Sequence, residues 1–413
     1  MTPKTLLLEG KLLAPGERLD TVCAMDVEAI PAQDQVLAVI VPDLFHATQT
    51  FFHEHIANIH PGRTVVVHLS SNSNRALTDV PVLEVPLVPR WPAHRSGLAG
   101  KLAGFANNIG TSRLNHQDRQ RIASFFKEHG VTHLLAEFAT SGVLILPVAE
   151  RLRLPLTVLS HGWDINILGE GRVWRSRYAK LFGSHAQLAA VCEFLRGRMV
   201  RIGASAEKIS LIPCAVDAGS FEPVLHGPEP ARVVMVCRLI EQKGPLQGLR
   251  AFALAHRERP ELTLDIVGNG PLNAALLSEI DQLQIGPAVR FHGDLAHRDT
   301  LKVVARSHIF IQHCMTLPGK GIESQAISLL EAMGHGLVPI VTRHGGMADH
   351  VTNGERGWLV EEGDEAMMAR QIVAMADDPV RRQQLGVAAR DYVLKFFSRA
   401  TIYPAMRRTL GLR

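Results

Sequence analysis

Two glutamates, Glu323 and Glu331, lie eight residues apart after an apolar run that is typical of a strand. The residues between them predict the start of a helix that ends near Gly336. Eight helical residues span about 12 Å, close to the distance from the sugar to the ribose of a nucleotide-sugar. Free N–H groups at the helix start, at Ile327 and Ser328, would favour a diphosphate between them. The spacing indicates a clamp on a nucleotide-diphosphate sugar; a solvent-facing helix with two incidental glutamates is the alternative.

A basic pair, Arg238 and Lys243, directly follows another apolar run. Arginine as a planar fork and lysine as a mobile charge could converge on a pyrophosphate. Cleavage of the sugar–phosphate bond leaves negative charge on the diphosphate, so two fixed cations would stabilise the transition state. Such pairs are common after strands, and this pair alone is a weak signal.

A glycine-containing turn, Gly268-Asn269-Gly270-Pro271, follows a third apolar run. Its glycines permit a tight turn and a close approach of the backbone to a ligand, and Pro271 suits the first position of a helix. We expect Gly268 and Gly270 to contact the donor; an ordinary strand-to-helix turn is the alternative.

His161 and Asp164, in the first half, lie at the carboxyl end of a predicted strand. Such positions face the ligand site of a doubly wound sheet. His161 could therefore bond a sugar hydroxyl and Asp164 an acceptor hydroxyl. A lone histidine is more often structural, but four strand-end motifs around one predicted cleft favour function.

Short apolar runs alternate with longer amphipathic stretches along the whole chain, which predicts a parallel α/β architecture. A segment rich in Gly, Pro and acidic residues, 217–231, reads as a linker. We therefore expect two facing Rossmann-like doubly wound domains with a cleft between them: an acceptor-binding domain over residues 1–216, a nucleotide-sugar-binding domain over 232–395, and a C-terminal helix over 396–413 that packs back on the first domain. The predicted strands are Gln35–Val41, Arg63–His68, Thr132–Ala136, Leu156–Leu159 and Leu188–Val191, then Arg232–Cys237, Leu262–Val267, Val289–His292, Ile309–Gln312, Val338–Val341 and Trp358–Val360.

The composition, with 46% hydrophobic and 20% charged residues in 413, is that of a globular enzyme. We see no secretory signal or membrane-spanning run, and expect a cytoplasmic protein. Five widely spaced cysteines and the absence of CxxC or HExxH spacing predict neither disulfides nor a metal site. His53 and His55, which flank Glu54, are interpreted as ordinary surface histidines.

Positive charge is concentrated in the first half, where 16 Lys or Arg stand against 7 Asp or Glu from Val85 to Ser205. This suits an acidic or phosphorylated partner, or peripheral contact with an anionic membrane surface at the inner face; a solvated basic surface is the alternative. Nucleic acid is not expected, because the basic residues are not interleaved with aromatic ones in a known binding motif.

Taken together, these motifs resemble the retaining glycosyltransferases of the family that includes sucrose-phosphate synthase and many bacterial polysaccharide transferases, which have the two-domain GT-B architecture. The family's two glutamates with seven residues between them match Glu323 and Glu331, and its HGxD loop matches His161 to Asp164. The segments 48–54 and 212–217 resemble the "SETF…E" and "HCGVD" segments of a subgroup that builds exopolysaccharides, including colanic acid and amylovoran.

This resemblance implies that Glu323 contacts the donor sugar, Glu331 the ribose, Arg238 and Lys243 the diphosphate, and His161 the sugar near its anomeric centre. It implies that no cofactor is needed, because the nucleotide-diphosphate sugar is a co-substrate. It also implies a glycan or lipid-linked acceptor. Where the family usually has glycines after the first glutamate, this chain has Ser324 and Ala326, which we expect to narrow the space around the donor.

Two other functions remain open on these residues. A nucleotide-sugar epimerase shares the architecture and could bind the same donors, but the glutamate spacing with the Arg/Lys pair argues against it. A non-catalytic nucleotide-sugar binding protein would bind donor without turnover.

Overall fold

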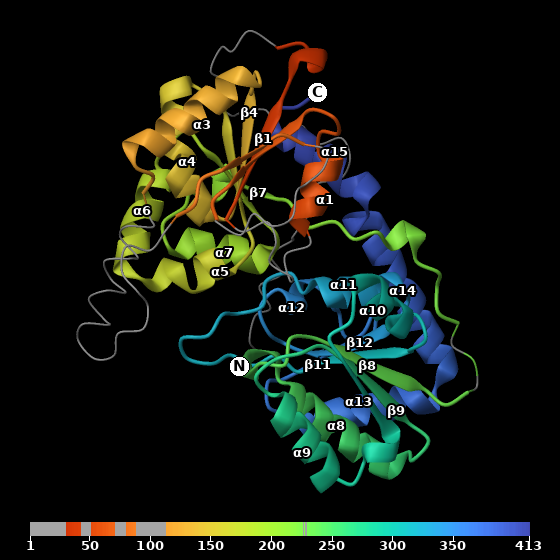
Figure 1. The fold of residues 1–413 in the computed structure, drawn as a ribbon. Helices are drawn as coiled ribbons and strands as arrows, with labels where there is room; N and C mark the ends of the chain where they lie inside the picture. Colours follow the sequence, from red (N-terminus) through yellow and green to blue (C-terminus); the bar gives the residue numbers. More distant parts are fainter. Residues whose placement is uncertain (1–29, 43–50, 71–79, 88–112, 226, 228) are drawn as a thin grey trace, which may run out of the picture.

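The computed structural model describes residues 30–42, 51–70, 80–87, 113–225, 227 and 229–413, arranged as two α/β domains (Figure 1). The first domain contains a seven-stranded parallel sheet in the order β3-β2-β1-β4-β5-β6-β7. Its strands are β1 (Leu37–Val41), β2 (Thr64–His68), β3 (Val82–Glu84), β4 (His133–Glu137), β5 (Leu156–Ser160), β6 (Gln187–Ala190) and β7 (Ile209–Leu211). Its helices are α1 (Phe51–Asn58), α3 (His116–Glu128), α4 (Ala139–Leu152), α5 (Trp163–Asn166), α6 (Arg172–Phe182) and α7 (Glu193–Arg201).

The second domain contains a six-stranded parallel sheet in the order β10-β9-β8-β11-β12-β13. Its strands are β8 (Arg232–Val236), β9 (Thr263–Val267), β10 (Val289–Gly293), β11 (Ile309–Gln312), β12 (Val338–Thr342) and β13 (Trp358–Val360). The helices of this half are α8 (Pro245–Glu258), α9 (Asn273–Gln282), α10 (His297–Val304), α11 (Ile327–Gly334), α12 (Met347–His350), α13 (Glu365–Asp377), α14 (Pro379–Phe397) and α15 (Arg399–Leu410).

The central strands of both sheets are mainly apolar on both faces. In β1, the run LAVIV is buried at all five positions, because helices cover both sides of the sheet. The strand order reverses between β1 and β4 in the first sheet and between β8 and β11 in the second. Ligands of doubly wound sheets bind at such a reversal, outside the carboxyl ends of the strands. The predicted fold class of two facing Rossmann-like domains is confirmed.

All eleven predicted strands are present, and two short strands were missed. The missed strands β3 and β7 have three residues each and lie at the two edges of the first sheet. The helix after β11 begins at Ile327, so Glu323 lies in the preceding loop while Glu331 lies inside the helix.

The chain ends by crossing back between the domains, through α14 and α15 (blue in Figure 1). Tyr403 and Met406 of α15 are buried in the core of the first domain. At the crossing, Arg399 forms ion pairs with Glu54 at 2.9 Å and with Asp217 at 2.8 Å. Both carboxylates come from the two exopolysaccharide-subgroup segments, so these segments join the C-terminal helix to the first domain. Residues 48–50 of the first segment lie outside the described residues. So do residues 1–29, at the start of the chain.

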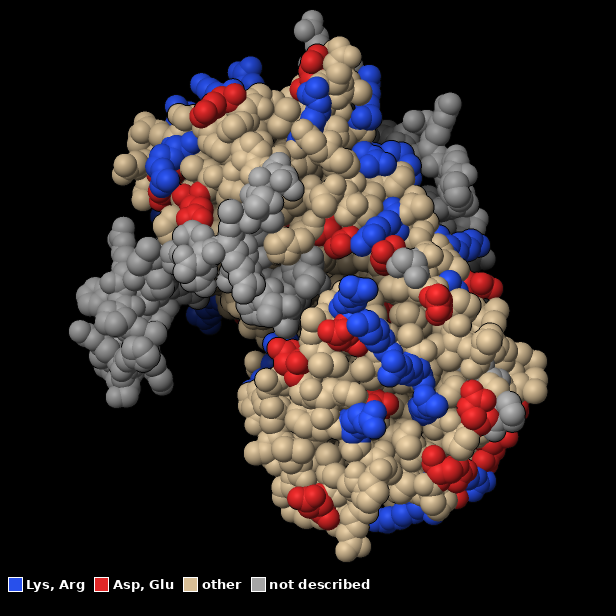
Figure 2. Space-filling view, turned by 45° about the vertical axis from the view of Figure 1, so that its right-hand side comes forward, with Lys and Arg blue, Asp and Glu red and all other residues tan. Residues whose placement is uncertain are grey.

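On the face shown in Figure 2, basic and acidic side chains are interspersed over both domains. None of the described helices is long and apolar enough to cross a membrane.

Candidate functional site

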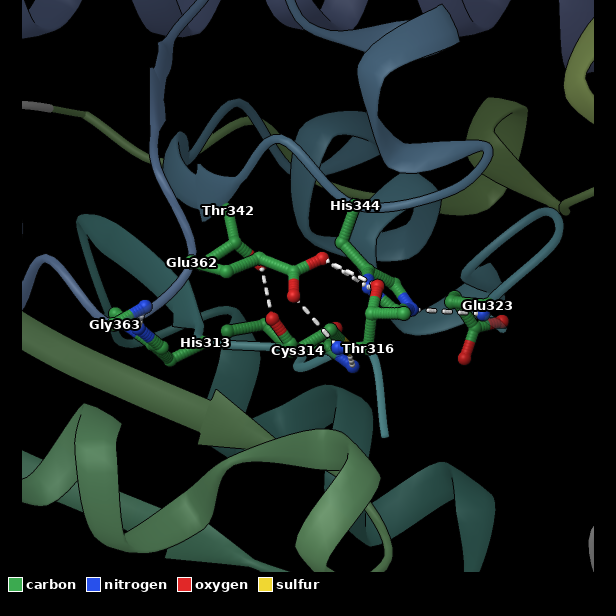
Figure 3. Close-up of polar contacts among 9 residues, drawn as sticks. His313, Cys314, Thr316, Glu323, Thr342, His344, Glu362 and Gly363 are labelled. Carbon is green, nitrogen blue, oxygen red and sulfur yellow. Dashed lines mark hydrogen bonds and ion pairs between the residues drawn. The ribbon is translucent and has the colours of Figure 1, made fainter. Parts of the chain in front are cut away.

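The loop between β11 and α11 holds Glu323 by its backbone and by its side chain. The Glu323 N–H donates to His344 Nε2 at 3.1 Å (Figure 3). The Glu323 carbonyl oxygen accepts from the N–H of Gly346 at 3.0 Å. Its Oε1 accepts from the N–H of Ala326 at 3.1 Å, which fixes the carboxylate at the start of α11. The first glutamate is therefore held in one place before any ligand contact.

Two glycines that the sequence analysis missed, Gly345 and Gly346, make this close packing possible. A Cβ on Gly345 would overlap the carbonyl oxygen of Glu323, and one on Gly346 would overlap that of Ser324. Gly345 also has a φ of +52°, in the left-handed region that favours glycine. The paired glycines after a strand were a readable signal for a close backbone approach.

Lys243 forms an ion pair with the Glu323 carboxylate. The two side chains are only 13% and 16% exposed. Burial lowers the pKa of Lys243. The family resemblance implies that Glu323 contacts the donor sugar and Lys243 the diphosphate, and the structure brings the two side chains into direct contact. A ligand that binds both side chains must therefore break the ion pair between Lys243 and Glu323.

Glu331 on α11 accepts a hydrogen bond from His297 Nε2, the first residue of α10, at 2.6 Å. Hydrogen bonding to Glu331 raises the pKa of His297, which is 56% exposed in its side chain. His297 was not predicted, because nothing in the sequence relates two residues that lie 34 positions apart.

Gly268 and Gly270 pack against backbone rather than open space. A Cβ on Gly268 would overlap the carbonyl of Cys237, and one on Gly270 that of Leu239. In this turn the carbonyl oxygen of Asn269 also accepts a hydrogen bond from the N–H of Leu239 at 2.9 Å. The close approach that these glycines allow is therefore to the segment that contains Arg238, whose side chain is exposed. Their predicted contact with the donor stays a prediction.

In the first domain, His161 is held by a buried carboxylate. Its Nε2 lies 2.6 Å from Glu137 Oε2, and the other carboxylate oxygen lies 2.7 Å from His55 Nδ1. Phe51 stacks on the His161 ring with a centroid separation of 4.3 Å, and Cys214 Sγ lies 3.6 Å from Nδ1. With both nitrogens facing protein groups and the side chain 6% exposed, the ring is fixed on every side. The contact of Cys214 with Nδ1 is the weakest of these, because a thiol is a weak hydrogen-bonding group.

Glu137 keeps its charge although it is fully buried. Burial acts to raise the pKa of Glu137, but the charge of His55 and the hydrogen bonds from both histidines outweigh it and bring the pKa to about 2. His55 itself is 1% exposed, so its interpretation as a surface histidine was wrong. The readable signal was its position three residues after Phe52 on α1, which places both on the buried face of the helix.

The prediction that Asp164 binds an acceptor hydroxyl does not fit the structure. The residue is 0% exposed, and its carboxylate accepts from the N–H groups of Ala139 at 2.7 Å and Gly162 at 3.0 Å. Ala139 is the first residue of α4, so the carboxylate stabilises that helix start and the loop after β5. Asp164 is a structural residue that shapes the loop around His161.

The loop with Glu323 also contacts the first domain. Gln325 pairs with Cys214 through two bonds, accepting from its N–H at 2.7 Å and donating to its carbonyl at 2.8 Å. Ser324 lies against Gly162, where an added Cβ would overlap its hydroxyl, and 3.4 Å from Asn166 Nδ2. The Ser324 side chain thus packs between the domains, where it was expected to narrow the donor space.

The cysteines and histidines of the chain were predicted to form neither disulfides nor a metal site. Among the described residues no group of three or more His, Cys, Asp or Glu side chains could hold a metal ion. Four cysteines are free thiols, and Cys23 lies outside the described residues.

Comparison with known proteins agrees with this arrangement. Residues 220–392 match the family described as "Glycosyl transferases group 1". The putative colanic acid biosynthesis glycosyltransferase WcaL of Escherichia coli is 25% identical over 246 residues, which cover 59% of this chain and 61% of that protein. The amylovoran biosynthesis glycosyltransferase AmsK of Erwinia amylovora is 23% identical over 288 residues, covering 68% of this chain and 70% of that protein.

Among solved structures, Anabaena Alr3699/HepE in complex with UDP aligns with a TM-score of 0.73 and 18% identity, over 91% of this chain and 99% of that chain. This likeness concerns the fold. The chain therefore has a two-domain GT-B fold, and its residues 220–392 are similar to the group 1 glycosyl transferases. The predicted resemblance to exopolysaccharide glycosyltransferases is confirmed.

Proposed function

We propose that this protein is a retaining glycosyltransferase that moves a hexose-type sugar from a nucleotide-diphosphate sugar to a polysaccharide, lipid-linked oligosaccharide or other glycan. The observation that supports this most is the Lys243–Glu323 ion pair before α11. It places a cation for phosphate and a carboxylate for sugar hydroxyls side by side, next to the helix that contains Glu331.

In this proposal the donor replaces that ion pair. Lys243 and Arg238 then contact the diphosphate, and Glu323 accepts hydrogen bonds from sugar hydroxyls. Glu331 loses its hydrogen bond from His297 and accepts one from the ribose instead. The N–H groups of Ile327 and Ser328, in the first turn of α11, point their partial positive charge at the phosphates.

The chemical step breaks the bond between the anomeric carbon and the diphosphate oxygen. The electron pair stays on the diphosphate, where Arg238 and Lys243 stabilise the developing charge. The acceptor hydroxyl attacks from the face that the diphosphate leaves, and its proton passes to the departing phosphate oxygen. Configuration is thus retained, with neither a metal ion nor another cofactor required, and His161 borders the anomeric centre.

A cavity of about 270 Å³ on the outer helices of the first domain supports an anionic partner. Four cationic side chains and no acidic one line it, above an apolar floor from α4. Burial lowers the pKa of Arg177, and the like charge of Arg113 adds to this effect. A lipid phosphate or the anionic inner membrane surface would relieve this repulsion. The cations are Arg113, Arg119, Arg177 and Lys180.

A substitution of Glu323 tests the proposal. Glu323→Gln keeps the size of the side chain but removes its charge, and we expect transfer to fall at least about 100-fold (roughly 2.7 kcal/mol or more), as for other groups that stabilise a transition state. UDP-glucose is the first donor to assay, since HepE binds UDP and UDP-glucose, and GDP-mannose the second, since a Mycolicibacterium smegmatis relative depends on it.

The matched control is Glu279→Gln. Glu279 also forms an ion pair, with Arg250, and is 15% exposed, but it lies on α9 away from the loop. Transfer by this variant should stay within about twofold of the wild type. Normal turnover in Glu323→Gln would refute the site assignment. Donor-only incubation that epimerises the sugar, or donor binding without turnover on any acceptor, would favour the epimerase or the non-catalytic binding protein.

A further inference from the structure

A chain of hydrogen bonds runs from a third strand end to the backbone of Glu323 (Figure 3). It starts at Glu362, just after β13, passes through His344, just after β12, and ends at the Glu323 N–H in the loop after β11. Three neighbouring strands of the second sheet thus meet in one polar network. Neither Glu362 nor His344 has a role in the proposed chemistry above.

The geometry determines which His344 nitrogen bears the proton. Glu362 Oε1 lies 2.7 Å from His344 Nδ1, and a carboxylate can only accept, so Nδ1 must donate. His344 Nε2 is then the lone pair that accepts from the Glu323 N–H at 3.1 Å. Glu362 is itself held by Thr316, which donates from its N–H at 2.6 Å and from its hydroxyl at 2.8 Å. The His344 side chain is 0% exposed, so water cannot substitute for either bond.

We propose that His344, oriented by Glu362, is a positioning residue that sets the Glu323 carboxylate for the donor sugar. This inference rests on the proposed function, because it assumes that Glu323 contacts that sugar. The bond ends on the backbone of the same residue that pairs with Lys243, so a lost bond would move the carboxylate relative to its cation. A purely structural histidine would stabilise the domain without changing the affinity for UDP-glucose relative to that for UDP.

Protonation of His344 would oppose this arrangement, because an Nε2–H would face the Glu323 N–H. The charged groups around the ring are Glu362 after β13, Glu323 in the loop and Lys243 before α8. Burial lowers the pKa of His344 and the Lys243 charge adds to this, while Glu362 opposes them. The neutral ring is therefore kept at neutral pH and is lost only as the pH falls below the ordinary histidine range, about 6.5.

Two amide substitutions separate the two bonds of His344. In His344→Asn the amide reaches only the level of Nδ1, so it can still donate to Glu362 but no longer accepts from Glu323. In His344→Gln the amide oxygen reaches the level of Nε2 and can accept from Glu323. Loss of one hydrogen bond predicts that His344→Asn weakens UDP-glucose binding about tenfold, while His344→Gln stays within about threefold of the wild type.

Affinity for UDP alone is the readout that distinguishes positioning from damage. UDP lacks the sugar, so both variants should bind it within about twofold of the wild type. His256→Asn serves as the control, since His256 also bonds the backbone, at the carbonyl of Leu262 at 3.1 Å, but lies on α8. Equal loss of UDP and UDP-glucose binding in His344→Asn would overturn the proposal in favour of a structural role, and so would wild-type affinities for both.

A pH series gives a second readout. The preference of the wild type for UDP-glucose over UDP should fall as the pH drops from 6.5 to 5, and the His344→Gln profile should be flatter. Identical acid profiles would count against the proposal. Glu323→Gln is run in parallel: if it binds UDP-glucose and transfers sugar normally, the proposed function fails; if it is impaired while both His344 variants are normal, only the positioning fails.

Discussion

Each domain uses a histidine and a carboxylate at its strand ends, but the two networks are built differently. In the first domain, Glu137 is 0% exposed and is shared by His55 and His161. In the second, Glu362 is 26% exposed and holds the single histidine His344. In the first network the carboxylate bonds only histidine side chains among the contacts described above. In the second network the histidine bonds the backbone N–H of Glu323, a loop residue.

The difference indicates which half of the site is rigid. His161 is enclosed by Phe51, Cys214 and Glu137, and the loop beside it is fixed by the buried Asp164. The Glu323 loop instead carries the Lys243–Glu323 ion pair, which an entering donor would have to break. We therefore infer that the first domain supplies a fixed wall and that the loop of the second domain supplies the groups that rearrange when the donor enters.

The largest expected effect comes from the first network. Glu137→Gln would remove a buried charge that two histidines contact, and should lower the free energy of unfolding by about 3 kcal/mol. Glu362→Gln keeps one acceptor oxygen in a partly exposed position, and should cost about 1 kcal/mol or less. Thermal and urea unfolding of both variants measure the comparison. Equal losses would contradict the inferred difference in rigidity.

The second prediction concerns Asp164. In Asp164→Asn one of the two backbone N–H groups loses its buried acceptor, so the free energy of unfolding should fall by about 1–3 kcal/mol. Transfer assays at low temperature, where the variant stays folded, should show an unchanged KM for acceptor. A raised acceptor KM with normal stability would restore the acceptor-binding role that the sequence suggested.

The sequence predicted the fold well because buried parallel strands are continuous apolar runs. The missed strands β3 and β7 are three-residue edges that each contain a polar residue, Glu84 and Ser210, whereas the predicted edge strand β13 is wholly apolar. Glu323 and Lys243 were also proposed as site residues, since each belongs to a local motif after a strand. Their direct contact was not, because it joins residues 80 positions apart.

Other errors have a shared physical cause. Polar residues at strand ends look alike in sequence whether they bind a ligand or satisfy backbone N–H groups, so Asp164 was misassigned. His344, Glu362 and His297 form hydrogen bonds with groups on other loops and helices, and no spacing rule links these residues. Only the tertiary structure shows which polar groups at the end of a sheet meet each other.

The smallest expected effect is at Ala326, where the Glu323 loop enters α11. This alanine has a φ of +54°, in the left-handed region, which costs a residue with a Cβ roughly 1 kcal/mol. Ala326→Gly removes that strain but adds conformational freedom to the unfolded chain, about 0.5–1 kcal/mol. The two terms nearly cancel, so the free energy of unfolding should change by less than about 0.5 kcal/mol.

The control for this prediction is Ala332→Gly, inside the same helix at a buried position. There no strain is relieved, and the substitution should cost about 1 kcal/mol or more. Ala326→Val should be worse than either, because a β-branched residue is strongly disfavoured in the left-handed region. If the two glycine variants unfold at the same denaturant concentration, Ala326 is not strained. Ala326 would then contribute no strain to the entrance of α11, and the loop would resemble the first-domain wall in this respect.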